Sequence, residues 1–183
     1  MSFDTLADQP TRYGPVTRAL HWGMALLFAA QFASAATHFF LPRENELRQT
    51  LWSYHTDLGV TLFVLILLRG VWGLMNLSKR PPLHGGLIGR AALAGHTLLY
   101  VLMVAVPASR ILAAAGGTRG LSWFGLPVIP ARETEIAWLD SLSEWHGEMG
   151  WLLAFTIIGH IAMALVWHTA MKRDGTLRRM VGK

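Results

Sequence analysis

EWHGEMGWLLAFTIIGHIAMALVWHTAMK, residues Glu144 to Lys172, is the stretch that decides the fold. Its apolar part is long enough to cross a lipid bilayer as one helix. His146 stands near its start, and His160 follows about four helical turns later. A helix would separate these two imidazoles by about 21 Å along its axis and by only about 40° around it. Because ionisable groups inside a membrane are costly and usually functional, the two histidines indicate a binding role that needs partners from other helices.

Composition places the chain among membrane proteins. It has 183 residues, of which 52% are hydrophobic and 15% charged, and its mean hydropathy is positive. We expect a single membrane domain over residues 1–183, in contact with the lipid bilayer. No cleavable signal peptide is expected ahead of the first apolar run. The net charge of +5 lies beside apolar runs and not in a separate basic domain, so no nucleic-acid partner is expected.

The chain contains no cysteine. This excludes structural disulfides, cysteine-ligated iron–sulfur clusters and the C-x-x-C-H attachment of c-type haem. Any haem in this protein must therefore be held without a covalent bond.

Four apolar runs predict an all-α bundle of four transmembrane helices. The tail before the first run is polar and contains prolines, so we expect it to lie at the surface without helix. Between the runs we expect a compact polar turn, then a basic loop, then a long segment lying against the membrane surface. The predicted spans are about 19–41, 52–77, 91–115 and 146–171, and the three connections are 42–49, 78–90 and 118–145.

Basic residues are distributed unequally between the two sides of such a bundle. Ten lie in the two tails and the 78–90 loop, whereas four lie in the other two connections. Because cytoplasmic loops carry the excess of Lys and Arg, both termini are predicted to be cytoplasmic.

The histidines of the predicted spans then sort by depth. His55 and His146 fall at the outer level, and His21 and His160 fall at the inner level, with His96 as an inner competitor. Two opposed imidazoles at each of two depths are what the axial ligation of two b-type haems requires. A four-helix bundle supplies the opposite walls. The remaining histidines, namely His38, His84 and His168, are interpreted as hydrogen-bonding or interfacial residues.

Neighbouring residues fit this interpretation. Gly59 follows His55 by four residues and Gly150 follows His146 by four, so a flat ring could approach the backbone there. Arg69 follows His55 by the same number of residues as His160 follows His146. Arg69 therefore lies on the same helix face as His55, but at the inner level. There its guanidinium could pair with a haem propionate. The alternative for Arg69 is a guanidinium that reaches the headgroups. Arg110 could serve the outer haem similarly.

Other metal chemistries fit less well. A di-iron carboxylate bundle needs Glu-x-x-His on facing helices, and EWHGE does not have that spacing. A zinc site built from two histidines without cysteine or carboxylate would be poor. No P-loop, HExxH motif or glycine-rich dinucleotide fingerprint is present. A non-haem metal transporter or a proton transporter remains open.

At this point the chain resembles a known family, the bacterial cytochrome b561 proteins, which are related to the cytochrome b subunits of nickel–iron hydrogenases and formate dehydrogenases. The resemblance runs from about Tyr13 to Gly182. It implies two b haems with ligands His21, His55, His146 and His160, and it makes His96 a neighbour of the inner haem. The motifs that carry it are RYGPVTRALHW, SYHTDLG followed by Arg69, GHTLLY followed by Pro107, LSWFGLPVIP, SEWHGEMGW, Gly159-His160 and KRDGTLRRM.

The resemblance also implies a function. It implies electron transfer across the bacterial inner membrane between an outer donor, either a small molecule or a protein, and the quinone pool. In one branch the donor is superoxide and the acceptor is ubiquinone. Family members often have two adjacent histidines where this chain has Trp167-His168, which makes these two residues candidates for a quinone site. The alternative is a haem b anchor and electron-conduit subunit of a larger dehydrogenase or hydrogenase.

Overall fold

A computed structural model describes residues 3–81 and 85–182 of the chain, so His84 lies outside the described residues. The described part contains four helical segments that are long and apolar enough to cross a membrane. The predicted fold class, an all-α bundle of four spans, is therefore confirmed. The four segments are Pro15–Phe40, Glu46–Met75, Gly86–Gly116 and Ala137–Met171.

The first span begins earlier than predicted. Helix α2 covers Pro15–Phe40, and a short helix α1, Phe3–Leu6, precedes it. The prediction that the tail before Ala19 contains no helix was therefore wrong. Proline is accepted at the first position of a helix, because the N–H that it lacks would have no partner within the helix anyway.

The second span also has an earlier helical start than expected. Helix α3, Glu46–Ser53, occupies part of the predicted polar turn, and α4, His55–Met75, follows after Tyr54. Asn45 starts α3 because its side chain accepts a hydrogen bond from the backbone N–H of Arg48 at 3.2 Å. His55 is thus the first residue of α4.

The last two spans are longer than the apolar runs. Helix α5 covers Gly86–Gly116, so the end of the predicted basic loop is helical. The segment before the fourth span is also partly helical. Four elements follow one another there: α6, Ala137–Asp140; the 3-10 helix η2, Ser141–Glu144; α7, Trp145–Ala162; and the π-helix η3, Met163–Met171.

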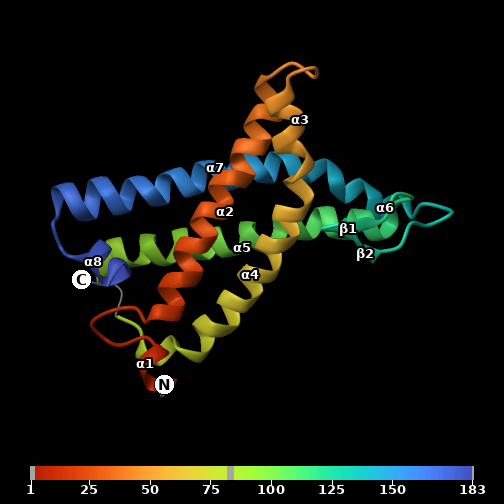
Figure 1. Cartoon of the computed structure of the whole chain (residues 1–183). Coiled ribbons are helices and arrows are strands. Elements are labelled where there is room, and N and C mark those ends of the chain that lie inside the picture. Colours follow the sequence, from red (N-terminus) through yellow and green to blue (C-terminus); the bar gives the residue numbers. More distant parts are fainter. Residues whose placement is uncertain (1–2, 82–84, 183) are drawn as a thin grey trace.

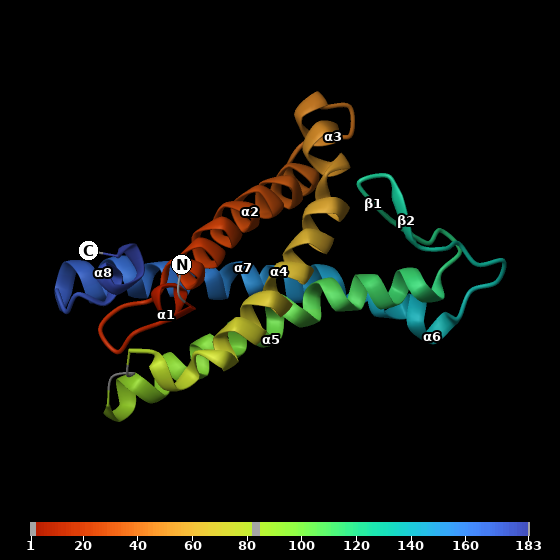
Figure 2. The same cartoon turned by 60° about the horizontal axis from the view of Figure 1, so that its bottom comes forward.

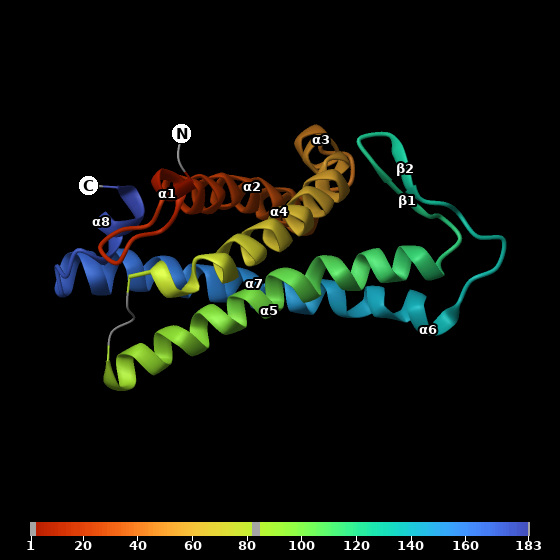
Figure 3. The ribbon, with the colours of Figure 1, turned by 90° about the horizontal axis from the view of Figure 1, so that it is seen from below.

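The spans are arranged as two pairs of helices. Helix α2 packs along α4 and α5 packs along α7, while α4 crosses α5 (Figure 1). Figure 3 shows that both chain termini and the start of α5 lie at one end of the bundle, which we call the termini end. Helices α3 and α6 lie at the other, the hairpin end. Buried leucines join α5 to α7, whereas most other apolar side chains of the spans are exposed, as lipid contact requires.

A β-hairpin closes the hairpin end beside α4 (Figure 2). Strand β1, Leu121–Trp123, pairs with β2, Leu126–Ile129, and the two-residue turn has positive φ angles at Phe124 and Gly125, as a type I′ turn requires. The Phe124 N–H donates to Asp57 Oδ1 at 2.7 Å, and Trp123 Nε1 donates to Thr61 Oγ1 at 3.1 Å. The long connection is therefore attached to a membrane-spanning helix.

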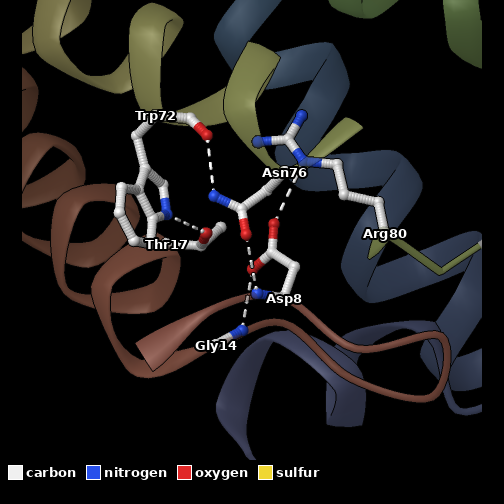
Figure 4. Close-up of polar contacts among 6 residues, drawn as sticks. All are labelled: Asp8, Gly14, Thr17, Trp72, Asn76 and Arg80. Atoms are coloured by element: carbon white, nitrogen blue, oxygen red, sulfur yellow. Dashed lines mark hydrogen bonds and ion pairs between the residues drawn. The ribbon is translucent and has the colours of Figure 1, made fainter. Parts of the chain in front are cut away.

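A buried polar network closes the termini end (Figure 4). Asp8 is only 2% exposed, and its carboxylate accepts hydrogen bonds from Gly14 N at 2.8 Å and from Arg80 Nε at 3.1 Å. The Asp8 N–H donates to Asn76 Oδ1, and Asn76 Nδ2 donates to the carbonyl of Trp72. These bonds attach the N-terminal segment to the end of α4.

The C-terminal segment packs over the same end. After the π-helix, α8, Thr176–Val181, folds back toward the start of α2. Trp22 Nε1 donates to the carbonyl of Met180 at 3.1 Å, and the Tyr13 N–H donates to the carbonyl of Arg179 at 3.2 Å.

Candidate functional site

The structure places the four predicted ligand histidines in two pairs. At the hairpin end, the ring centres of His55 on α4 and His146 on α7 are 6.2 Å apart. At the termini end, the ring centres of His21 on α2 and His160 on α7 are 6.3 Å apart. The two rings of each pair are inclined at 79° to each other. Helix α7 thus contributes one imidazole to each pair.

Each pair brings together imidazoles from two helices that do not pack closely on each other. Within residues 3–81 and 85–182, α7 packs closely on α5 and not on α2 or α4, yet the partner imidazoles come from α2 and α4. A side-chain methyl group at Gly150 on α7 would meet no atom of the described residues within 4 Å. The backbone of α7 near His146 therefore borders space that no described residue fills, and the presence of a flat ligand there stays a prediction.

The hairpin-end pair has a defined tautomer. His146 Nδ1 lies 2.9 Å from the backbone carbonyl of Val106, which can only accept, so this nitrogen carries the proton. His55 Nδ1 lies 2.7 Å from Ser34 Oγ, and that hydroxyl donates its own proton to the carbonyl of Gln31 at 2.7 Å. His55 Nδ1 must therefore also be the donor. In both rings Nε2 keeps the lone pair that a metal needs.

The termini-end pair has a cation beside it instead of neutral acceptors. The guanidinium of Arg69 donates to His21 Nδ1 at 3.1 Å, so the neutral His21 ring carries its proton on Nε2. Arg69 also lies over the ring of Tyr100 at 5.9 Å. The predicted propionate partner is thus directed at a predicted ligand.

His96, predicted as a neighbour of the inner pair, lies close to it. Its ring centre is 5.3 Å from that of His160, and its Nδ1 donates to the carbonyl of Ala92 at 2.7 Å.

The predicted accessory residues of the hairpin end, Gly59 and Arg110, have different neighbours. A methyl group at Gly59 would lie 3.4 Å from the side-chain nitrogen of Gln31, so Gly59 gives this amide room. Arg110 is close enough to both hairpin-end histidines to interact with them electrostatically. It also borders a cavity of about 120 Å³ that includes Glu135 and Asp140.

The quinone-site candidates Trp167 and His168 lie in the π-helix at the termini end. Such helices are rare and occur frequently at functional sites. His168 Nδ1 contacts Asp174 Oδ2 at 2.7 Å. Burial raises the pKa of the Asp174 carboxyl, but hydrogen bonds from Thr176 and His168 outweigh burial, so the pKa lies below its ordinary value and the group is ionised at neutral pH.

Three residues around His55 were missed by the sequence analysis: Ser34, Gln31 and Trp52. The Trp52 ring stacks on His55 at 4.5 Å and on His38 at 3.6 Å. Gln31 Nε2 lies 3.1 Å from His55 Nε2. The available signal was the presence of the polar residues Gln31 and Ser34 among the apolar residues of α2, but only the packing of α2 on α4 shows which histidine they reach.

The two histidine pairs fit haem ligation. A metal between two imidazole nitrogens, each about 2 Å from it, places the ring centres about 6 Å apart, as both pairs have. In the described part of the chain, no three His, Cys, Asp or Glu side chains converge as a non-haem metal site would need. Paired imidazoles on separated helices are the donor set of a b-type haem.

Comparisons with known proteins agree with this chemistry. The model of the family described as prokaryotic cytochrome b561 matches residues 12–183. Cytochrome b561 homolog 2 of Escherichia coli K12 is 29% identical over 185 residues, covering 100% of this chain and 96% of the relative. A probable superoxide oxidase CybB of Yersinia pestis is 29% identical over 179 residues, covering 94% and 97%. Cytochrome b561 homolog 1 of Escherichia coli K12 is 26% identical over 175 residues, covering 93% and 97%.

Proposed function

The chain belongs to the prokaryotic cytochrome b561 family, and from this membership we propose that it is a two-haem electron carrier between a donor at the hairpin end and quinone at the termini end. Family membership makes it a multi-pass membrane cytochrome b that transfers electrons. The observation that carries the finer proposal is that α7 contributes one imidazole to each of two pairs at opposite ends. The excess of basic residues at the termini end supports a cytoplasmic position of that end in the inner membrane.

The residues of the chain have distinct parts in this proposal. His55 and His146 hold one haem, and His21 and His160 hold the other. When bound, a haem iron gains and loses single electrons, which no side chain of this protein does readily. The chain fixes the positions, tautomers and charges around each iron. Arg69 would turn from His21 toward a propionate, because a buried cation and a carboxylate attract strongly.

The proposed acceptor chemistry balances with a one-electron donor. A quinone takes up two electrons and two protons to become a quinol. If the donor is superoxide, as the name of the Yersinia pestis relative suggests for that protein, two superoxide anions each lose one electron and leave as O2. His168, held by the ionised Asp174, is positioned to pass a proton at the termini end, which supports a quinone site there.

The proposal is tested by rapid mixing of the purified full-length protein with superoxide and, separately, with a short-chain quinol. We expect absorbance changes of reduced b haem with both reagents. His168→Phe should slow reduction by quinol and leave reduction by superoxide unchanged, because it alters only the termini end. Trp138→Phe serves as a control, since Trp138 is an exposed tryptophan of the hairpin end.

Failure of quinol to reduce either haem would reject the quinone part of the proposal. If quinol reduces the haems and superoxide does not, the electron donor is a different molecule, such as a protein partner.

A further inference from the structure

The hydrogen bonds of Ser34 make it more than a packing residue. Its side chain is buried, with only 1% of the residue exposed, within a membrane-spanning helix. Its hydroxyl donates to the carbonyl of Gln31 and accepts the proton of His55 Nδ1, both at 2.7 Å. A hydroxyl has one proton to donate, so the direction of the second bond follows from the first.

We propose that Ser34 is a positioning residue of the hairpin-end haem site, which holds the His55 ring with Nε2 as its electron-pair donor. This inference rests on the proposed function and adds a residue to it. A ligating histidine commonly donates its other N–H to an acceptor, and that bond fixes the ring and makes the ligand more basic. The backbone carbonyl of Val106 accepts the corresponding hydrogen bond from His146 Nδ1. Of the two acceptors, only Ser34 can be removed by a substitution.

Two further contacts hold the same ring. Trp52 stacks on His55 with an angle of 26° between the planes, which limits rotation of the imidazole. Gln31 Nε2 lies 3.1 Å from His55 Nε2, the nitrogen with the lone pair, so the amide donates to it. The Gln31 carbonyl oxygen Oε1 is buried without a hydrogen-bond partner among the described residues.

Gln31 therefore acts in the opposite direction to Ser34. Its amide occupies the electron pair of His55 that a haem iron must take, and it has to leave when the haem binds. Ser34 prepares His55 for ligation, whereas Gln31 competes with the ligand. The structure thus assigns opposite effects on haem affinity to two residues of one helix.

The test is a titration of haem-depleted full-length protein with haemin in detergent, followed by a redox titration of the saturated protein. His146→Ala and His160→Ala identify the signals of the two sites. Ser34→Ala should weaken haem binding at the hairpin end by about 10- to 100-fold, the usual effect of losing such a partner. It should also raise the midpoint potential of that haem, because a less basic ligand favours the ferric state less. Gln31→Leu should strengthen binding at this site by about fivefold, the equivalent of one lost competing hydrogen bond.

Thr37→Ala is the matched control. Thr37 lies one turn further along α2, and its hydroxyl donates to the carbonyl of Ser34 at 3.0 Å. This variant should leave both affinities and both potentials unchanged. The inference is overturned if Ser34→Ala behaves like Thr37→Ala, or if it shifts both haems equally, which would indicate general loosening of the bundle. Absence of a hairpin-end haem in the wild-type protein would instead reject the proposed function.

Discussion

The two histidine pairs have the same geometry and differ in which ring nitrogens carry the proton. Their ring centres are 6.2 and 6.3 Å apart, and both pairs are inclined at 79°. At the hairpin end, both Nδ1 atoms donate to oxygen acceptors, so both Nε2 atoms keep their lone pairs. At the termini end, Arg69 donates to His21 Nδ1 and the proton is on Nε2. At the hairpin end, only the Gln31 amide has to leave His55 Nε2 before that nitrogen can bind a metal. At the termini end, both the hydrogen bond from Arg69 and the proton of His21 have to move.

This difference indicates that donor type and spacing do not by themselves define a haem site. The hydrogen bonds behind the ligands decide which ring nitrogen is available, and charges nearby adjust the potential. A cation beside the termini-end pair favours the reduced state there. A cation, Arg110, also acts on the hairpin-end histidines, but the hydrogen bonds of their Nδ1 atoms go to neutral acceptors, whereas Arg69 is hydrogen-bonded directly to His21. We therefore expect the hairpin-end haem to have the lower potential, which would favour the proposed transfer toward the termini end.

The largest effect is expected from removing one histidine of α7 at a time. His146→Ala should abolish the hairpin-end haem and keep the termini-end haem, while His160→Ala should do the reverse, because each loses one of two axial ligands. Haem content per chain, measured as the pyridine haemochrome, should fall by half in each. Loss of both haems in either variant would show that the sites are not independent.

A smaller effect is expected from the network that closes the termini end. Asp8→Ala leaves Gly14 N and Arg80 Nε without their acceptor and should destabilise the protein by about 1–3 kcal/mol. Thermal unfolding in detergent measures this loss. Asp8→Asn keeps one acceptor oxygen and should lose less. An unchanged unfolding temperature for Asp8→Ala would mean that the network does not stabilise this end.

Arg69→Met should shift the termini-end haem selectively. Removal of the cation should make reduction of this haem less favourable by roughly 1–2 kcal/mol and so lower its midpoint potential. This is the Coulomb energy of a charge several ångströms away at an intermediate dielectric constant. A redox titration gives both potentials in one experiment, with the hairpin-end haem as internal reference. Equal shifts of both haems would argue against a local role of Arg69.

The smallest effect is expected at the hairpin. Asp57→Ala removes the acceptor of the exposed Phe124 N–H and should cost less than about 1 kcal/mol. Faster amide hydrogen exchange in residues 121–129 would report it. Thr61→Val, which removes the bond from Trp123, is the companion variant, and unchanged exchange in both would show that other contacts hold the hairpin.

The sequence predicted the four spans and the histidine pairing because both follow from periodic properties of single helices. Apolar length gives the spans, and a spacing of about four helical turns between His146 and His160 gives two depths on α7. Helix ends were less accurate, because capping by Asn45 and the acceptance of Pro15 at a helix start extend the helices into polar sequence. These are local effects that hydropathy does not report.

The residues behind the ligands could not be predicted in the same way. Ser34 and Gln31 reach His55 only because α2 packs on α4 in one particular register. Asp8 contacts Asn76 and Arg80, which are far from it in the sequence. Such contacts depend on tertiary packing and leave no periodic signal.

The proposed function requires two b haems per chain, each held between two histidines. It is tested most directly by measuring the haem-to-protein ratio of the purified wild-type protein together with its reduced-minus-oxidised spectrum during a redox titration. We expect two haems per chain, low-spin b-type spectra and two separate midpoint potentials. One haem per chain, or a spectrum of high-spin iron with an open coordination position, would contradict it.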